Sequence, residues 1–416
     1  MRFRVRRTRG GARMDRKKIL FISNGHGEDA IAVKIAQRLA RRAKVETAIE
    51  AWPMVGAGEA YRDLGLPRVG AFNLLPSCGF ATLSLRLLVQ DLRAGWIRTH
   101  WRQVRSARAL RGRYDLVVAV GDIVVIAAAR LTRSPFVFVG CAKSSYYAFM
   151  SGYTRLEKRL LRRHCLLTFP RDRLTVAELE RAGVRNEYAG NPMMDDLEGD
   201  GETFGLGGDI EVLGLLPGSR LDMERNAVHL LEVLARCRPS PGGRGVCGLF
   251  APPDRFDTDG LVRVLGDGSG WRVEDAEPHD ARRGIVLRLR HGAGAGALFV
   301  KGKFADVIRR SRVVVGTAGT ANEQAVGLGR PLITFPTAGV MGKRYVKMKM
   351  QFFGSAARRV SPEPQAVAAA VDDLLRDREL RERMAAAGRE RMGDPGASER
   401  IASRLEKFLE SPVQAP

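Results

Sequence analysis

Residues 17–36 have the sequence KKILFISNGHGEDAIAVKIA, and this stretch decides the fold class. A short run of β-forming apolar residues enters a Gly-rich turn, and an amphipathic helical pattern follows at once. The order strand, turn, helix predicts the first unit of an α/β protein. Further strand-like runs follow at 45–51, 114–122, 135–140, 164–170, 186–192, 212–220, 245–253, 285–292, 312–320 and 331–336. We therefore expect parallel sheets covered by helices on both faces.

The spacing of these runs divides the chain into two parts. Residues 196–210 include a Gly-rich acidic stretch typical of a linker, and the alternation restarts beyond it. We expect a disordered basic extension over 1–16, an N-terminal Rossmann-like domain over 17–195 and a second doubly wound domain over 211–345. The two domains are expected to face each other across a cleft. Residues 346–416 are expected to form helices that pack back toward the N-terminal domain.

The charge of the chain favours an anionic partner. Among 416 residues, 69 are basic and 46 acidic, which gives a formal charge of +23, and almost all of the excess is arginine. Nine basic residues and one acidic residue fall within the first eighteen, where Met14 is an alternative start that would leave out residues 1–13. Such an excess is typical of proteins that bind phosphate, nucleic acid or an acidic membrane surface.

The cysteine, histidine and apolar patterns argue against three other classes of protein. Five cysteines without a CxxC and six histidines without a paired spacing predict neither a disulfide scaffold nor a metal site. Asp122 interrupts the longest apolar run, 116–131, so no segment is expected to span a membrane. The apolar run after the basic start is too short for a signal peptide. We expect a cytoplasmic protein.

A long basic helix is predicted over residues 80–111. It combines Leu, Ile and Trp side chains with seven arginines. This composition is typical of a helix that lies in a membrane interface. The alternative is that its apolar side packs on the sheet while the arginines are solvated.

The turn NGHGED, residues 24–29, has more than one interpretation. With Ala30 it matches the dinucleotide-binding pattern G-x-G-x-x-A, and Glu50 would then bind the ribose. Glu28 and Asp29 in the first helical turn would however repel a pyrophosphate. The turn is better suited to a neutral, hydroxyl-rich ligand. A tight turn followed by capping acids is the structural alternative.

A carboxylate follows the strand predicted at 114–121. Asp122 lies where an open parallel sheet places its ligand, outside the carboxyl ends of its strands. Partial burial would raise its pKa toward neutrality, as a general base requires. Helix capping alone also explains an aspartate at this position.

Two turns in the second half are suited to a phosphorylated ligand. At 216–220, Gly218 permits close backbone approach, Ser219 offers a hydroxyl and Arg220 a two-pronged donor. At 316–324, small residues around Gly319 leave the backbone N–H groups of a helix start open to a diphosphate, without a lysine or a metal. Glu323 lies one turn further on, where its carboxylate can accept two ribose hydroxyls. The Gly-rich run at 291–296 precedes no helix and is expected to be a loop.

Several motifs together resemble one known family. They are NGHGED (24–29), AVGD (119–122), VGCAKSSYY (139–147), AGNPMMD (189–195), LLPGSR (215–220) and AGTANEQAVGLGRPLITFP (318–336). With these motifs, nearly all of residues 17–400 resemble the lipid-A-disaccharide-synthase-related proteins. These are relatives of lipid-A-disaccharide synthase in the GT-B glycosyltransferase superfamily. Residues 337–354 are richer in Lys and Met than the family pattern.

The resemblance implies a GT-B-like fold in which the second domain binds a nucleotide sugar and the first binds the acceptor. For the catalytic base we expect Asp122 first, with His26 or Glu28 second. The nucleotide-sugar site would contain Gly218, Ser219, Arg220, Gly319, Thr320, Ala321, Asn322, Glu323 and Gln351. The acceptor site would contain Asn24, Gly25, Gly27, Asp29, Lys143, Ser144 and Asn191.

Residues and resemblance together predict an inverting, metal-independent glycosyltransferase without a cofactor. It would transfer a GlcNAc-type sugar from a UDP-sugar to a lipid-linked or membrane-proximal acceptor. Its other expected partner is an anionic membrane surface, the inner face of the cytoplasmic membrane. We expect residues 80–111 to bind it. One alternative is a nucleotide-sugar epimerase of the same fold. The other is a nucleic-acid-binding protein, which the charge favours but which lacks a recognisable binding module.

Overall fold

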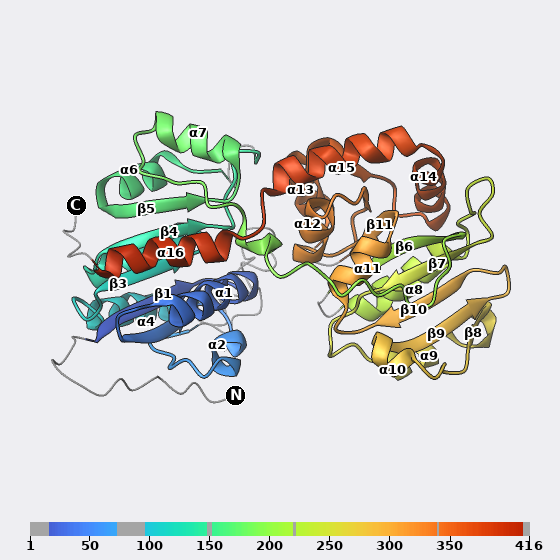
Figure 1. The fold of residues 1–416 in the computed structure, drawn as a ribbon, viewed down its shortest axis with the longest axis horizontal. Coiled ribbons are helices and arrows are strands. Elements are labelled where there is room, and N and C mark those ends of the chain that lie inside the picture. The colour runs from blue at the N-terminus through green and yellow to red at the C-terminus, as the bar shows by residue number, and fades with distance from the viewer. Residues whose placement is uncertain (1–15, 73–95, 148–151, 219–221, 339–340, 411–416) are drawn as a thin grey trace. The chain divides into compact units, whose positions relative to one another are not determined.

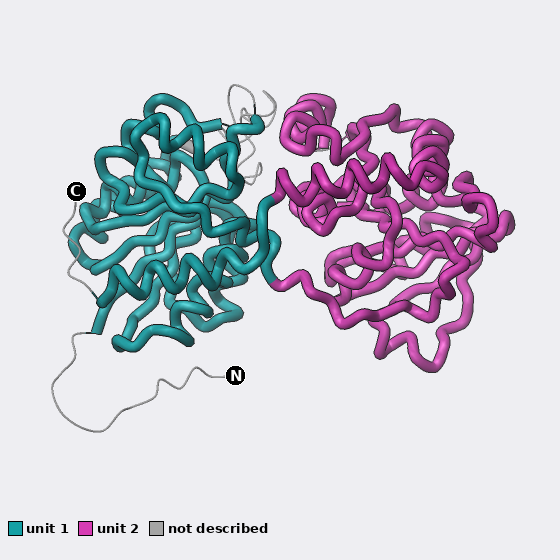
Figure 2. The backbone as a smooth tube through the Cα atoms, turned by 45° about the horizontal axis from the view of Figure 1, so that its top comes forward, with its two compact units in different colours: residues 1–195, 393–416 teal, residues 196–392 magenta. Residues whose placement is uncertain are grey.

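The chain forms two compact units, each an α/β sandwich (Figures 1 and 2). The computed structural model describes residues 16–72, 96–147, 152–218, 222–338 and 341–410. Unit 1 consists of residues 1–195 and 393–416, and unit 2 consists of residues 196–392. The chain therefore leaves unit 1 after Asp195 and returns to it at Gly393.

Unit 1 is built on a parallel sheet in the order β2-β1-β3-β4-β5. Its strands are β1 (Lys17–Ser23), β2 (Thr47–Pro53), β3 (Leu116–Val120), β4 (Phe136–Gly140) and β5 (Cys165–Pro170). Its helices are α1 (His26–Arg42), α2 (Glu59–Asp63), α4 (Trp96–Ala109), α5 (Ile123–Thr132), α6 (Arg155–His164), α7 (Arg173–Arg181), the 3-10 turn η2 (Pro192–Met194) and α16 (Ala397–Glu410). The order reverses between β1 and β3, which is the point where open sheets of this kind bind ligands.

The central strands of unit 1 are apolar because both faces of the sheet are covered. All five residues of β3, LVVAV, are buried. On one face they pack with α1 and α16, through residues such as Ile35 and Leu405. On the other face they pack with α4 and α5, through residues such as Ala107 and Ile126.

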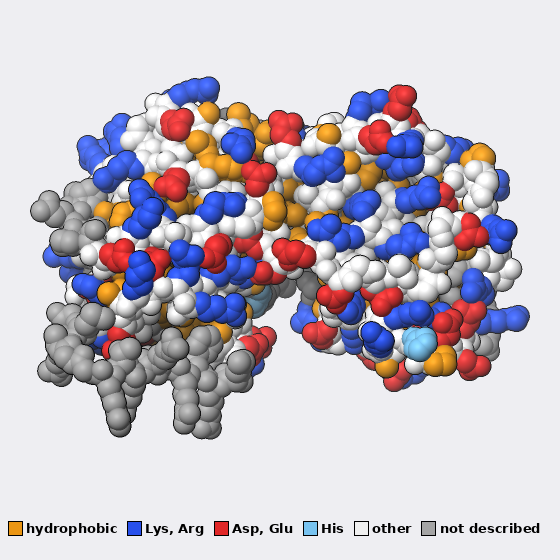
Figure 3. Space-filling view, in the orientation of Figure 1, with side chains coloured by type: hydrophobic (Ala, Val, Ile, Leu, Met, Phe, Trp, Pro, Cys, Tyr) orange, Lys and Arg blue, Asp and Glu red, His pale blue; other side chains and the backbone are white. Residues whose placement is uncertain are grey.

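The C-terminal helix α16 belongs to unit 1 and packs against α1. Arg42 of α1 pairs with Glu399 at 2.6 Å and with Glu406 at 3.5 Å. The buried carboxylate of Asp195 accepts the backbone N–H groups at the start of α16, those of Gly396, Ala397 and Ser398. Asp195, the last residue of the AGNPMMD motif, thus fixes the start of the returning helix. Figure 3 shows acidic and basic side chains interspersed along α16.

Unit 2 is built on a mixed sheet in the order β13-β12-β11-β6-β7-β10-β9-β8. Its strands are β6 (Ile210–Leu216), β7 (Gly245–Phe250), β8 (Trp271–Val273), β9 (Ile285–His291), β10 (Gly296–Val300), β11 (Val313–Gly316), β12 (Leu332–Thr334) and β13 (Ala357–Arg359). Its helices are α8 (Met223–Leu234), α9 (Thr258–Leu265), η3 (Asp267–Ser269), α10 (Asp280–Arg283), α11 (Phe304–Arg310), α12 (Thr320–Gly327), α13 (Lys343–Phe353), η4 (Gly354–Ala356), α14 (Pro364–Arg376) and α15 (Arg378–Met392). The order reverses between β6 and β11.

Two strand predictions were wrong in detail. β9 and β10 are antiparallel, and the expected loop between them is a hairpin turn closed by the His291 N–H to Ala295 C=O bond of 2.9 Å. Four residues between strands allow a hairpin but no parallel crossover. The run at 186–192 is no strand. It forms a single bridge at Asn186, and its Pro192 begins η2 instead.

Candidate functional sites at two sheet edges

In unit 1, polar side chains gather at the carboxyl ends of β1 and β3, where the strand order reverses. The Asn24 side-chain amide donates to Asp122 Oδ1 at 2.7 Å. Gly121 makes this approach possible, because it has a φ of +142° and a Cβ there would lie 1.9 Å from Asn24 Oδ1. Two residues that lie 98 positions apart are thus brought together at the predicted edge.

Asp122 is held by one oxygen. Its Oδ1 also accepts the Val124 N–H at 2.8 Å and so caps α5. Among the described residues, its Oδ2 accepts no hydrogen bond. Capping and a catalytic role are therefore compatible, because they use different oxygens of the same carboxylate.

The environment of Asp122 favours the protonated form. Burial raises the pKa of Asp122 above its ordinary value, and the Val124 N–H bond offsets part of that rise. Lys143 and the Asn24 amide also lower this pKa, while Glu157 raises it. A carboxyl with a raised pKa is a stronger base than an ordinary aspartate once it is ionised.

Lys143 lies in the loop after β4 and forms a buried ion pair. Its Nζ is 3.0 Å from Glu157 Oε1, and the two side chains are 10% and 1% exposed. Glu157 is fixed in turn by a capping box, in which Thr154 and Glu157 bond each other's backbone N–H. Glu157 was not anticipated from the sequence. Its capping-box spacing was visible, but its pairing with Lys143 depends on the tertiary fold.

The first turn of α1 contains two acceptor-site candidates, Gly25 and Gly27, and the two further candidates for the base, His26 and Glu28. Gly25 is the N-cap of α1, and a Cβ there would lie 2.2 Å from Glu28 Oε2, so the Glu28 carboxylate folds back over the turn. His26 is exposed and lies against Gly56 of the loop after β2, where a Cβ would be 2.6 Å from the imidazole. Gly27 completes the turn. His26 and Glu28 stay candidates for the base.

Asp29 is buried under the turn. Ser23 Oγ donates to Asp29 Oδ1 at 2.5 Å and lies 2.6 Å from the Tyr61 hydroxyl. Burial raises the pKa of Asp29 to about 7, partly offset by the Ser23 bond and reinforced by the charge of Glu28. Asp29 therefore fixes the first turn of α1 to the end of β1, through its bond with Ser23.

Two further acceptor-site candidates are fully buried. Ser144 Oγ accepts the Tyr146 N–H at 3.1 Å. Asn191 caps η2 by accepting the Met193 N–H at 3.1 Å, and its own N–H donates to Asp394 C=O. In the structure, both side chains shape their loops.

Glu50 does not support dinucleotide binding. It lies within β2, three residues before the strand ends at Pro53, rather than at the edge. Its Oε2 accepts the Tyr114 hydroxyl at 2.5 Å.

In unit 2, the equivalent edge brings together the turns after β6 and β11. Gly218 has a φ of +89°, and a Cβ there would lie 3.3 Å from Thr317 C=O. Asn226 of α8 donates to Pro217 C=O at 3.0 Å and fixes this turn. Ser219 and Arg220 lie outside the described residues.

Helix α12 begins at the second of these turns. Its N-cap Gly319 has no side chain with which to cap the helix, and Thr320 and Ala321 form the first turn. Asn322 is 1% exposed and donates to Gly316 C=O at 3.1 Å. Glu323 is 3% exposed, so two adjacent polar side chains in the first turn of α12 are both buried.

Helix α13 completes the surroundings of Glu323. Lys349 Nζ lies 2.5 Å from Glu323 Oε1, and the two side chains are 12% and 5% exposed. The sequence prediction had no lysine at this site. No local pattern shows a pair whose members lie 26 residues apart on different helices. Gln351 is exposed on the same helix.

The described part of the predicted basic helix is α4; residues 80–95 lie outside the described residues. Its inner side is fixed by Gln103, which donates to Met54 C=O at 2.7 Å. Ile97 and Trp101 are 69% and 58% exposed, so these two apolar side chains do not pack on the sheet. Arg102 and Arg105 line a hollow of about 400 Å³ on this helix. Within the described part of the chain, none of the helices combines the length and the hydrophobicity that a membrane span requires.

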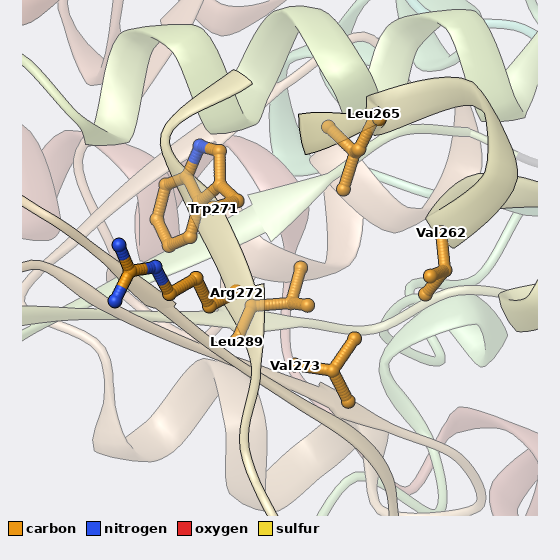
Figure 4. A pocket seen from close by; sticks show the side chains of 7 residues that line it. Val262, Leu265, Trp271, Arg272, Val273 and Leu289 are labelled. Carbon is orange, nitrogen blue, oxygen red and sulfur yellow. The ribbon is translucent and has the colours of Figure 1, made fainter. Parts of the chain in front are cut away.

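A second hollow, of about 260 Å³, lies on the edge of unit 2 between α9 and β8 (Figure 4). Its wall consists mainly of apolar side chains, with Trp271 and Leu289 on the sheet side and Leu265 on the helix side. Arg272 is its sole charged lining residue. It contains none of the predicted site residues.

Comparison with curated proteins shows sequence similarity to lipid-A-disaccharide synthases. The enzyme of Myxococcus xanthus (strain DK1622) is 26% identical over 288 residues, which cover 63% of this chain and 67% of that protein. The enzyme of Anaeromyxobacter sp. (strain K) is 24% identical over 320 residues, 72% of this chain and 76% of that protein. No family model matches the chain. These similarities support the family resemblance seen in the motifs.

Solved structures share the fold over nearly the whole chain. The S. aureus MnaA–UDP structure has a TM-score of 0.57 at 13% identity and covers 96% of this chain and 99% of its own. Acinetobacter baumannii MurG has a TM-score of 0.56 at 13% identity and covers 94% and 99%. The Neisseria meningitidis UDP-GlcNAc 2-epimerase bound to UDP-GlcNAc has a TM-score of 0.54 at 13% identity and covers 94% and 100%. The expected GT-B-like fold class is confirmed.

Proposed function

We propose that this chain is an inverting glycosyltransferase that moves a sugar from a UDP-sugar to a lipid-linked acceptor. The observation that carries this proposal is the state of Asp122, a partly buried carboxyl at the β1/β3 edge with one oxygen fixed and the other open. The similarity to lipid-A-disaccharide synthases supports the reaction class. The UDP and UDP-GlcNAc named for two proteins of the same fold support the donor class.

The proposed chemistry assigns the acceptor to unit 1 and the donor to unit 2. Asp122 Oδ2 takes the proton of an acceptor hydroxyl as that oxygen forms a bond to the anomeric carbon of the donor. The bond from the anomeric carbon to the β-phosphate oxygen breaks, and its electron pair leaves with UDP. Backbone N–H groups at the start of α12 stabilise the leaving diphosphate, and Glu323 accepts the ribose hydroxyls. Attack from the face opposite the leaving group inverts the anomeric configuration.

We further propose that α4 holds the protein at an anionic membrane surface, where a lipid-linked acceptor resides. Ile97 and Trp101 are exposed on the same helix as four arginines, at positions 98, 102, 105 and 108. Apolar side chains that enter the lipid headgroup region and cations that pair with anionic headgroups act together at such surfaces. Lys and Arg side chains elsewhere are spread over the visible face of both units rather than gathered in one patch (Figure 3).

UDP binding measured by calorimetry tests the donor site. Glu323→Ala removes the acceptor of the ribose hydroxyls, and loss of a charge-assisted pair of hydrogen bonds should weaken UDP binding by about 2 kcal/mol. Glu382→Ala, in an exposed i,i+4 pair of α15 in the same unit, is the matched control and should bind UDP like the wild type. Equal UDP affinity in Glu323→Ala and the wild type would place the nucleotide elsewhere.

The epimerase alternative has the same fold and the same donor class. It differs in its products, because an epimerase releases a changed sugar nucleotide and transfers no sugar to an acceptor. UDP release that depends on added membrane lipid extract supports the transferase. A changed sugar nucleotide formed without lipid supports the epimerase.

A further inference from the structure

A buried ion pair at the end of β11 joins two helices of unit 2. Lys349 of α13 pairs with Glu323 of α12, and both side chains are largely buried. The Lys349 ammonium also lies 5.6 Å from the ring centre of Tyr345 and 5.9 Å from that of Phe352. These rings border the cation with aromatic surface, where its electrostatic interactions are stronger than in water.

The same helix contacts the start of α12. A Cβ on Gly319 would lie 3.2 Å from the Tyr345 hydroxyl, so this hydroxyl stands at the N-cap. Tyr345 and Lys349 are four residues apart and therefore share one side of α13. This side of α13 faces both Gly319, the N-cap of α12, and the carboxylate of Glu323.

Stability alone is a weak explanation for this pair. Burying two charges costs desolvation energy that their attraction often only balances, and an apolar pair of similar size is commonly as stable. The neighbours of Lys349 in sequence are Met348 and Met350. A methionine at 349 would suit the same surroundings without a charge.

We propose that Lys349 is a nucleotide-binding residue, whose ammonium donates to a phosphate oxygen of a nucleoside diphosphate. The inference rests on the donor site proposed above and adds a cation to it. A carboxylate can accept several hydrogen bonds and an ammonium can donate three, so pairing between them is compatible with ligand contacts. Glu323 then binds the neutral ribose hydroxyls, and Lys349 binds the anionic diphosphate. The cation stabilises the charge that develops on UDP as it leaves.

The test compares UDP with uridine, which lacks the phosphates, by calorimetry on the full chain. In Lys349→Met the affinity for UDP should fall about 10-fold or more, the usual effect of a charge-assisted hydrogen bond. The affinity for uridine should change less than about 2-fold, because Glu323 remains. Lys347→Met, an exposed lysine of the same helix, is the control and should change neither affinity. Lys349→Arg should retain the UDP-to-uridine ratio.

The ratio of the two affinities separates a phosphate contact from a structural role. If Lys349 only positions Glu323, Lys349→Met lowers both affinities in parallel, and the unchanged ratio overturns the inference. Should that variant fail to fold, Lys349→Met/Glu323→Gln removes both buried charges, and its ratio must still fall about 10-fold. A wild type that binds neither UDP nor uridine overturns the donor site itself.

Discussion

Asp29 gives the structure a measurable dependence of stability on pH. This residue is 2% exposed in the first turn of α1, and its carboxyl accepts a hydrogen bond from the Ser23 hydroxyl. Burial raises its pKa from 3.8 to about 7. Between these values, the folded chain holds a proton that the unfolded chain has already lost.

The sign and size of the effect follow from linkage. Because the native state binds more protons in this window, the free energy of unfolding falls as pH rises from about 4 to about 7. A displacement of about three pKa units at about 1.4 kcal/mol each gives at most about 4 kcal/mol. Asp29→Asn cannot ionise, and its amide oxygen can still accept the Ser23 hydroxyl. Relative to the wild type, the variant should therefore become steadily more stable across this window.

Urea unfolding in a Trp271→Phe background reports on unit 1. This change removes the sole tryptophan of unit 2 and leaves Trp52, Trp96 and Trp101 in unit 1. Unfolding is measured from pH 4.5 to 8 with and without Asp29→Asn. Asp63→Asn, which changes an exposed acid of the same unit, is the control. A stability difference between Asp29→Asn and its parent that stays constant with pH would refute the burial argument.

Three other variants have defined outcomes. Gly121→Ala places a Cβ 1.9 Å from Asn24 Oδ1 and strains a positive φ. The free energy of unfolding should therefore fall by about 1–3 kcal/mol, and turnover should fall too. A variant with the stability and activity of the wild type would contradict this. Asp195→Ala removes the acceptor of three N–H groups at the start of α16. The free energy of unfolding should fall by about 2 kcal/mol, and limited proteolysis should cleave α16 more readily. Unchanged protease resistance would show that α16 does not depend on Asp195. Replacing Arg102 and Arg105 by Ser should weaken binding to anionic vesicles by about 1 kcal/mol per residue and make that binding less sensitive to salt. Binding equal to that of the wild type would show that these two arginines are solvated and do not contact the membrane.

The sequence predicted those site features that depend on local order. A strand, a Gly-containing turn and a helix follow one another around Asn24, Asp122 and Gly319. In a parallel sheet the carboxyl ends of the strands lie at one edge. These two facts together predict that Asn24 and Asp122 lie close to each other. The entirely apolar sequence of β3 likewise predicted a strand covered on both sides.

Features that depend on packing between distant segments could not be predicted. Nothing near Glu323 in the sequence indicates that Lys349 of a later helix pairs with it. The pair of Lys143 with Glu157 has the same character, since each residue is explained locally as a loop cation or a cap. The exposure of Trp101 also required the structure, because helical periodicity alone does not say which side a neighbouring sheet covers.

Transfer of radiolabelled sugar from UDP-GlcNAc into membrane lipid extract measures the proposed glycosyltransferase reaction itself. The wild type should release UDP only when lipid is present, with label entering the organic phase. Asp122→Asn should bind UDP normally, since its donor residues lie in the other unit, yet transfer label about 100-fold more slowly or worse. Transfer at the wild-type rate by Asp122→Asn would show that Asp122 is not the base. Label that stays in a sugar nucleotide whether or not lipid is present would show that the chain is not a lipid glycosyltransferase.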